Sequence, residues 1–386
     1  MKNIDWQPLE KQLAEWRAAI HRYPELSHQE TVTTDYIAQQ LSCYPQLEIT
    51  RPAATGLVVR LKGASPGRTV AFRADIDGLP VEEKSGLACA SIRPGLMHAC
   101  GHDMHSAMLM GAASTLAQRQ ASLKGEAVFI FQRGEEMSPG GAKELVDAGV
   151  LADVEMFFAL HVQPMLPAGT IALRRGVATS NRDTFHIHIE GRGGHSSMPH
   201  LIIDPLIAAS AAVQALQSII SREINPRESA VVSICSLICG DGTTAAIPND
   251  ARLCGTTRTF TAQVRQQIKE AMPRIVQDVA RAHRCRGDVA FDAWDYSAIV
   301  NDEALCDLAA AAAGETGLYQ EEDAPAFVGE DFSEYRAIAP VCFAWLGAAR
   351  EGEEWAPLHN AYFNPDEAAL LHGTRYYLSL AQKLLM

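Results

Sequence analysis

The sequence lacks any hydrophobic run long enough to cross a membrane, since no segment reaches the ~18 uninterrupted apolar residues that a spanning helix needs. Its nine cysteines are scattered without the spacing of a disulfide framework, and their odd number is typical of a reducing compartment. The stretch Met1–Trp6 lacks the apolar core and small-residue cleavage site of a signal peptide. We therefore expect a cytoplasmic protein with free thiols and no membrane contact.

The chain also lacks basic runs, internal repeats and low-complexity tracts. Its formal net charge of −13 repels nucleic acids and anionic membranes, so we expect no nucleic-acid partner. An anionic substrate would need a local cationic pocket that acts against this overall field. What remains is ordinary globular material, with 47% hydrophobic and 20% charged residues. A length of 386 residues predicts two or three domains.

Hydrophobic periodicity divides the chain into two kinds of structure. Residues 1–180 and 293–386 alternate apolar β-type runs with helical segments, which is typical of an α/β domain. The continuous apolar run at 127–131 predicts a strand that is covered on both faces. Residues 181–292 read as strand, helix, two strands, helix and strand, with period-two alternation at 184–189. We therefore predict an α/β fold of two domains, in which 181–292 is an α+β insertion.

Individual elements follow from the same patterns. The helices expected are 9–22, 31–41, 104–118, 141–148, 204–221, 261–281, 303–314 and 367–385. The strands expected are 56–61, 69–74, 127–131, 156–160, 184–189, 230–237, 251–259, 288–293 and 341–346. Asp103 is a candidate N-cap for the third of these helices.

The stretch from His98 to His105 is the densest group of polar side chains in the chain. Its eight residues include three histidines, a thiol and a carboxylate, and buried polar groups need partners. Cys100 and His102 are two residues apart, which fits neither the CxxC of a zinc knuckle nor the HExxH of a zincin helix. In a turn that Gly101 permits, both side chains can still converge on one metal ion.

Carboxylates follow two of the predicted strands. Asp75 and Asp77 lie at the end of one strand, where α/β enzymes place their chemistry. Glu135 and Glu136 come directly after the buried strand at 127–131. An isolated Glu-Glu pair usually heads a helix as a solvated acidic pair, but adjacent carboxylates can also divide the work. One then binds metal while the other acts as a general base with a raised pKa.

Two further histidines complete the candidate metal site. The apolar run 156–160 ends at His161, and His359 lies in a late loop. A single histidine of this kind is more often an ordinary core residue. A metal site is indicated because four separate segments of the chain each supply a candidate ligand. One thiolate, three imidazoles and a carboxylate accommodate zinc, cobalt, nickel or manganese.

Taken together, these motifs resemble those of the amidohydrolase branch of the M20 metallopeptidases, which includes hippurate hydrolases, auxin-conjugate hydrolases and N-acetyl amino acid deacetylases. The resemblance covers nearly the whole chain, and its motifs are Arg73–Pro80, His98–His105, Phe131–Glu136, Gly193–Ser196 and Leu358–Asn360. This chain departs from the family by having Arg-Gly, in place of Pro-Ala, before the two glutamates. That change is expected to bear on substrate choice more than on reaction type.

The resemblance implies a centre of two divalent metal ions whose identity (zinc, manganese, nickel or cobalt) is open. It implies Glu135 as the general base, and Asp75 as the carboxylate that orients the ligands, with Asp77 as the alternative. The ligands that it implies are Cys100, His102, Glu136, His161 and His359.

For the insertion, the resemblance implies a ferredoxin-like lid that often serves as a dimerisation surface, and hence a homodimer. Its Gly-Gly-His loop would bring His195 to the scissile carbonyl as an oxyanion donor, within one chain or from a partner chain. Asn249 and Arg258 would engage the carboxylate of the substrate.

The expected function is the metal-dependent hydrolysis of an N-acyl amino acid or a dipeptide. Glu135 would deprotonate a metal-activated water and then protonate the leaving amine. One alternative is a dipeptidase or carboxypeptidase of the same family. A second is a hydrolase with Cys100 as its nucleophile. A non-catalytic binding protein is a third, which the intact Glu135 disfavours.

Overall fold

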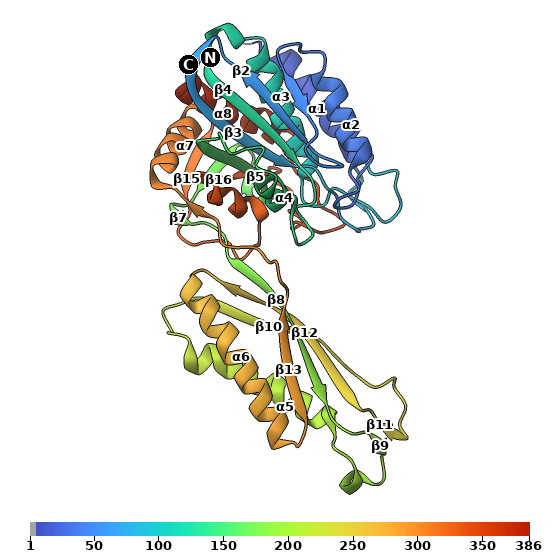
Figure 1. The fold of residues 1–386 in the computed structure, drawn as a ribbon. Coiled ribbons are helices and arrows are strands. Elements are labelled where there is room, and N and C mark those ends of the chain that lie inside the picture. Colours follow the sequence, from blue (N-terminus) through green and yellow to red (C-terminus); the bar gives the residue numbers. More distant parts are fainter. Residues whose placement is uncertain (1–4) are drawn as a thin grey trace. The chain divides into compact units, whose positions relative to one another are not determined.

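The computed structural model describes residues 5–386, which form two compact units (Figure 1). Unit 1 comprises the chain up to Ala178 together with Ile299–Ala324 and Asp331–Met386. Unit 2 comprises Thr179–Ala298 and Pro325–Glu330. Met1–Ile4 lie outside the described residues, so the expectation about Met1–Trp6 is only partly covered. Within 5–386, no helix has the length and apolar character that a bilayer-crossing segment requires.

Unit 1 is built on an eight-stranded mixed sheet covered by helices. Its helices are α1 (Trp6–His21), α2 (Thr31–Leu41), α3 (His102–Ala117), α4 (Gly141–Asp147), α7 (Glu303–Thr316) and α8 (Ala368–Leu385). In spatial order its strands are β1 (Glu48–Thr50), β2 (Leu57–Lys62), β4 (Lys124–Gln132), β3 (Ser65–Asp75), β5 (Met156–Pro167), β16 (Val341–Ala349), β6 (Thr170–Leu173) and β15 (Leu318–Glu321). A separate pair joins β7 (Gly176–Val177) and β14 (Val300–Asn301). The predicted α/β class with a large mixed sheet is confirmed.

The four central strands of this sheet run in the same direction. β3 pairs in parallel with β4 and with β5, and β5 pairs in parallel with β16. Their carboxyl ends therefore meet at one edge of the sheet, which is where α/β proteins bind ligands. Asp75 ends β3 and Gln132 ends β4 at this edge.

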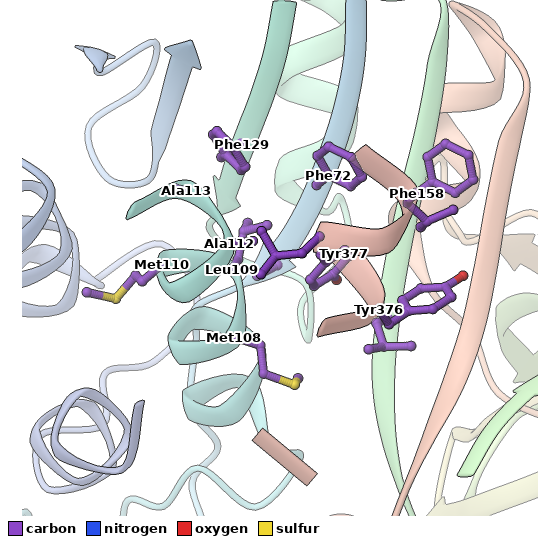
Figure 2. Packing of buried hydrophobic residues seen from close by; sticks show 14 of the residues in the cluster. Phe72, Met108, Leu109, Met110, Ala112, Ala113, Phe129, Phe158, Tyr376 and Tyr377 are labelled. Carbon is purple, nitrogen blue, oxygen red and sulfur yellow. The ribbon is translucent and has the colours of Figure 1, made fainter. Parts of the chain in front are cut away.

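The core of unit 1 lies between these strands and the helices that cover them. α3 and α8 pack on the sheet, α1 and α2 pack on α3, and α7 packs on α8. Figure 2 shows Phe72, Phe129 and Phe158 from three strands facing α3 and the tyrosines of α8. All sixteen residues of α3 are buried. The helix therefore has no solvent-exposed face and lacks the alternation of apolar and polar faces that a surface helix shows. A helix of this kind rigidly holds whatever lies at its start.

Unit 2 has a four-stranded antiparallel sheet with two helices on one face. Along the chain it contains β8 (Asn181–Glu190), α5 (Pro205–Ser218), β10 (Ala230–Cys239), β12 (Asp250–Thr259), α6 (Ala262–Ala282) and β13 (Arg286–Phe291). The spatial order of the strands is β10-β12-β8-β13. Phe185, Ile187 and Ile189 of β8 are buried with the helices, while the residues between them are exposed or half-buried on the open face. A small ribbon of β9 (Gly194–His195) and β11 (Ala246–Ile247) carries the glycine loop.

Capping side chains explain the starts of half of the α-helices in residues 5–386. The side chain of Asp204 caps α5 by accepting from the Leu206 amide, and Thr261 caps α6 by accepting from the Val264 amide. Asp302 caps α7 in the same way. Capping satisfies amide groups that the first helical turn leaves without a partner.

Several expected boundaries are wrong by two or more residues, and two of them bear on the site. α3 begins at His102, two residues before the predicted start. β5 continues to Pro167, so His161 lies inside a strand and not at its end. The neighbouring β16 extends the pairing, since Trp345 is opposite His161 and Gly347 is opposite Gln163. The apolar run in the sequence stops at Leu160 although the backbone pairing does not.

Candidate metal centre

The turn into α3 places the first candidate ligands. Gly101 adopts a φ of +86°, and a Cβ there would lie 2.3 Å from Val162 Cγ2, so both backbone conformation and space require glycine. The helix then starts at His102, which is fully buried. Asp103 falls in the first turn, and the prediction that it is the N-cap is wrong. Its carboxylate is engaged by side chains of α1 instead.

A buried ion network fixes this helix start. Asp103 Oδ2 accepts from Arg17 Nε at 2.9 Å and lies 2.9 Å from His21 Nδ1, while His21 Nε2 lies 3.1 Å from Glu83 Oε1. Because both ring nitrogens of His21 face carboxylates, the ring donates twice and is cationic. Burial alone would lower the pKa of His21, but Asp103 and Glu83 raise it to about 9. Arg17 and His21 lie four residues apart among the buried residues of α1, a spacing that places both on one face of the helix.

We expect this network to make the stability of the protein depend on pH. The folded-state pKa of His21 lies above its ordinary value of 6.5, so the stabilisation is complete below pH 6.5 and is lost as pH rises through about 9. Its size is on the order of 3 kcal/mol. Urea unfolding of the wild type and of His21→Gln across this range should show a difference in unfolding free energy that shrinks with pH. A constant difference would contradict the assignment.

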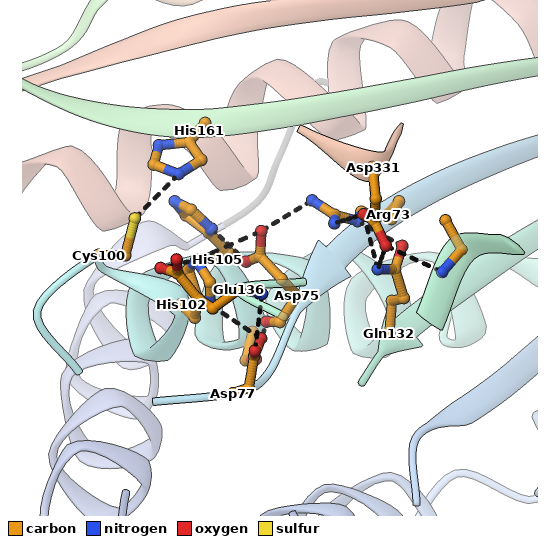
Figure 3. A network of polar contacts seen from close by, with 12 residues as sticks. Arg73, Asp75, Asp77, Cys100, His102, His105, Gln132, Glu136, His161 and Asp331 are labelled. Atoms are coloured by element: carbon orange, nitrogen blue, oxygen red, sulfur yellow. Dashed lines mark hydrogen bonds and ion pairs between the residues drawn. The ribbon is translucent and has the colours of Figure 1, made fainter. Parts of the chain in front are cut away.

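Five predicted ligands come together at the carboxyl edge of the sheet. Cys100 Sγ lies 3.5 Å from His161 Nε2 (Figure 3). Glu136 Oε1 lies 3.1 Å from His359 Nε2 and 3.9 Å from His102 Nε2. The structure thus brings together side chains from the α3 turn, the β4 loop, β5 and the late loop.

The two later histidines have backbone and ring environments that suit ligands. His161 Nδ1 lies 2.8 Å from the Val162 carbonyl and so donates to it, which leaves Nε2 as the free lone pair. Burial and the charge of His105 hold the pKa of His161 well below its ordinary value, so the ring is neutral. His359 has a φ of +63°, a strained conformation for a non-glycine residue, and its amide donates to the Ala99 carbonyl at 2.8 Å. Such strain is often found at functional sites.

The two aspartates at the end of β3 have different partners. Asp77 Oδ1 lies 3.2 Å from His102 Nδ1, and Asp77 Oδ2 accepts from Ser27 Oγ at 2.7 Å. Asp75 Oδ1 lies 2.5 Å from His105 Nδ1, while its Oδ2 is 3.6 Å from His102 Nε2. The geometry therefore favours Asp77, and not the predicted Asp75, as the carboxylate that orients His102. The contact of Asp77 with Nδ1 leaves the other ring nitrogen of His102, Nε2, directed toward the other ligands.

The buried polar atoms of this site fit a metal. His102 Nε2 and Glu136 Oε1 are buried without a hydrogen-bond partner. Burial would lower the pKa of His102, yet Asp75 and Asp77 raise it to about 10, so a positive charge is stabilised at this ring. A divalent cation bound to His102 Nε2 would provide that positive charge in place of a proton. Donor atoms that lie within 4.8 Å of one another form overlapping groups. One group is Cys100, Glu136 and His359, and a second is His102, Glu135 and Glu136. A third is Asp75, His102, His105 and His161.

The other predicted site residues lie in unit 2. His195 is exposed on β9, and its Nδ1 accepts from the Ser197 amide at 3.2 Å, so the ring proton resides on Nε2. Asn249 Oδ1 accepts from the Gly193 amide at 2.9 Å and thereby holds the glycine loop. Arg258 is half-buried on β12.

Comparison with known proteins identifies the family. Residues 71–383 match the model of peptidase family M20/M25/M40. N-acetyl-L-cysteine deacetylase of Bacillus subtilis (strain 168) is 38% identical over 385 residues, covering 99% of this chain and 90% of that protein. The chain belongs to peptidase family M20/M25/M40. The resemblance that the motifs predicted is confirmed.

Two further relatives bear on the metal centre and the chemistry. N-acyl-L-amino acid amidohydrolase of Geobacillus stearothermophilus is 39% identical over 286 residues, or 74% of this M20 chain and 77% of that protein. The solved structure of a dinuclear metal-binding M20 peptidase from Bacillus subtilis is 35% identical and has a TM-score of 0.83, covering 98% of this chain and 99% of its own. Overlapping donor groups that share Glu136 and His102 suit two neighbouring cations.

Within this M20 chain, burial and the surrounding negative charges disfavour Cys100 as a nucleophile. His161 lies close enough to serve as its base. However, burial and the carboxylates of Glu136 and Glu135 raise the pKa of the Cys100 thiol well above its ordinary value. A protonated thiol is a poor nucleophile, whereas a cation would displace that proton and make the thiolate a ligand.

A second buried group was missed from the sequence. Arg73 donates to Asp75 Oδ2 at 2.7 Å, to Asp331 Oδ1 at 2.9 Å and to Gln132 Oε1 at 3.0 Å (Figure 3). Gln132 Nε2 also donates to Asp331. An arginine and a glutamine inside otherwise apolar strands were the available signal. Burial would raise the pKa of Asp75, but His102, His105 and Arg73 hold it well below its ordinary value, so Asp75 is ionised beside the ligands.

We expect Asp77→Ala to weaken metal binding by about 10- to 100-fold, because His102 would lose the partner that sets its tautomer and orientation. Competition with a chromophoric chelator would measure this. Ser27→Ala removes one of the two partners of Asp77 Oδ2, keeps the contact with His102 and is expected to have a smaller effect. Unchanged affinity in the Asp77 variant would return the orienting role to Asp75.

Proposed function

We propose that this M20 family member is a metal-dependent amidohydrolase that cleaves N-acyl amino acids at the amide bond. The observation that carries this proposal is the buried donor group of Cys100, His102, Glu136, His161 and His359 with Glu135 beside it. Relatives that cover most of the chain are named for the deacylation of amino acids.

The five ligands would hold two divalent ions. When bound, such ions polarise the scissile carbonyl and acidify an attacking water. Glu135 is buried, with a carboxylate oxygen within 4.8 Å of donor atoms of His102 and Glu136, so it is placed to accept the proton of the water. The same carboxyl group then delivers that proton to the leaving amine. Asp77 keeps His102 in the tautomer that leaves Nε2 free.

The test is a substrate screen with protein stripped of metal and reloaded separately with zinc, manganese, cobalt or nickel. N-acetyl and N-benzoyl amino acids are expected to be hydrolysed, with activity lost on chelation and restored by metal. Turnover of dipeptides alone would instead indicate a dipeptidase or carboxypeptidase. Activity that survives exhaustive chelation but is abolished by thiol alkylation would indicate a cysteine hydrolase.

We further propose that residues 1–180 and 293–386 form the catalytic domain and that 181–292 form a ferredoxin-like lid. The βαββαβ order of unit 2 supports the second assignment. His195 would donate a hydrogen bond from Nε2 to the oxyanion. Asn249 and Arg258 would bind the carboxylate of the substrate.

A homodimer through the lid is part of the same proposal. The edge strand β10 exposes Val231, Leu237 and Ile238 beside its free backbone groups, a surface that tends to pair with another strand. Light scattering on wild type and on a variant with Ile238→Lys would test it, with a monomeric variant as the expected result. The nine cysteines, all free thiols, support a cytoplasmic location.

A further inference from the structure

The loop that carries Glu135 is held by a hydrogen bond on each side of that residue. The Gly134 amide donates to Glu30 Oε1 at 2.8 Å. The Glu136 amide donates to Asp77 Oδ2 at 3.0 Å (Figure 3). The residues between β4 and α4, all of which the structure describes, belong to no helix or strand, so these contacts are what fixes the backbone directly before and after Glu135. Hydrogen bonds from backbone amides to carboxylates are among the stronger ones in proteins.

Glu30 is a fully buried residue at the start of α2, and its carboxylate contacts neutral donors. Its Oε1 also accepts from the His28 amide at 2.8 Å, and its Oε2 accepts from Thr55 Oγ1 at 2.7 Å. Within residues 5–386, the donors that reach this carboxylate are thus two amides and a hydroxyl. Burial of a carboxylate without a cationic partner is costly, and it raises the pKa of Glu30. A glutamate is therefore a poor choice at this position for stability alone.

The ring of His28 packs against the same glycine. Gly134 has a φ of +61°, and a Cβ there would lie 2.5 Å from His28 Cε1 and 2.8 Å from His28 Nδ1. The ring thus occupies the space that a side chain at position 134 would need. His28 itself has a φ of +66°, which is uncommon for a residue other than glycine. This turn therefore places a ring and the carboxylate of Glu30 against the one residue that directly precedes Glu135.

Ser27 joins the second carboxylate to the same turn. Its Oγ donates at 2.7 Å to Asp77 Oδ2, which is the oxygen that accepts from the Glu136 amide. Residues 27–30 therefore support the loop on both sides of Glu135. α2 directly follows this turn and packs on α3, so the support is tied to the helical layer of unit 1.

We propose that Glu30 is a positioning residue for the general base: by holding the Gly134 amide, it fixes where the Glu135 carboxylate lies relative to the metal ligands. Glu30 touches neither substrate nor metal and acts through Glu135. The inference rests on the proposed amidohydrolase function, in which Glu135 moves the proton. A misplacement of a catalytic group by ~1 Å can cost about 10²-fold in rate. The position of the acceptor oxygen of Glu30 therefore matters, and its charge does not.

The test compares Glu30→Asp with Glu30→Gln. Aspartate keeps the charge but withdraws the acceptor by one methylene, so it is expected to lower kcat by about 10- to 100-fold, with smaller changes in KM and metal content. Glutamine loses the charge but keeps an acceptor for the Gly134 amide, and its amino group can donate to Thr55 Oγ1, so it should lose much less. Both constants are measured on metal-loaded protein with the fastest substrate among the N-acetyl and N-benzoyl amino acids.

Glu25→Asp is the matched control. Glu25 is also a buried carboxylate near this turn, but it accepts from the amide and the hydroxyl of Thr33 and so supports α2 in place of the loop. Its kcat should be that of the wild type. Combining Glu30→Asp with Glu135→Gln isolates the route, since the double variant should be no slower than Glu135→Gln alone. Hydrogen exchange of residues 133–140, measured by mass spectrometry, should be faster in Glu30→Asp and unchanged in Glu25→Asp.

Wild-type kcat in Glu30→Asp, or unchanged hydrogen exchange of the loop, would overturn the inference. A greater loss in Glu30→Gln than in Glu30→Asp would show that charge matters and position does not. An equal loss in the Glu135→Gln background, or in Glu25→Asp, would indicate a general structural role, and thermal unfolding of each variant identifies misfolding. If the wild-type protein hydrolyses no acylated amino acid, the proposed function fails, and the hydrogen exchange still decides whether Glu30 holds the loop. Normal wild-type turnover that ignores Glu30→Asp defeats this inference alone.

Discussion

Replacing Glu135 by glutamine is expected to lower kcat by about 10²- to 10⁴-fold while the protein keeps its metals. The amide has the shape of the carboxylate but cannot accept the proton of the attacking water or return it to the amine. Glu135 is buried beside the donors of His102 and Glu136, so no solvent group can readily replace it. Steady-state kinetics combined with metal analysis of the purified variant would measure both quantities.

Glu136→Gln is the matched control, because it makes the same change one residue away. Glu136 Oε1 faces the ring nitrogens of His359 and His102, so its loss should weaken metal binding first and lower activity as a consequence. Its backbone amide donates to Asp77, a contact that the substitution keeps. Metal lost from the Glu135 variant and retained by the Glu136 variant would reverse the two assignments.

His195→Ala should lower kcat by about 10²- to 10³-fold with a smaller change in KM, as removal of one oxyanion donor does. The acceptor role of Nδ1 toward the Ser197 amide leaves a proton on Nε2, which is what a donor to a developing oxyanion requires. Fold and metal content should be unchanged. His188→Ala, at another exposed histidine of unit 2, serves as the control. Wild-type turnover by His195→Ala would remove this histidine from the mechanism.

Mixing variants would show which chain supplies the histidine. If Glu135→Gln and His195→Ala proteins regain activity when they are co-assembled, His195 acts on the metal centre of a partner chain. If they do not, it acts within its own chain. The same experiment tests the proposed homodimer, since complementation requires assembly.

Much of the fold follows from local patterns in the sequence. α2 has the predicted bounds Thr31–Leu41, and α5 and α6 begin directly after the residues that cap them. These elements depend on spacing and capping, which short segments contain by themselves. By contrast, the sequence did not predict the short strands β6 and β15, because four residues carry too little periodicity to mark a strand.

The candidate site shows the same division. Cys100 and His102 were recognisable because Gly101 and the dense polar stretch around it are local features. The local sequence does not show which of Asp75 and Asp77 orients His102, because both lie at the end of the same strand. The two differ in the histidine that each contacts, which is His105 for Asp75 Oδ1 and His102 for Asp77 Oδ1.

The sequence by itself determined the chemistry that is available: a thiol, imidazoles and carboxylates at strand ends and turns, together with the helices and strands that local spacing encodes. Tertiary structure alone decided which of these groups meet. Parallel pairing of β3 with β5 places Asp75, at the end of β3, near His161, which lies within the longer β5. Burial then fixes their protonation, because the pKa of a group depends on the charges around it and not on its place in the chain.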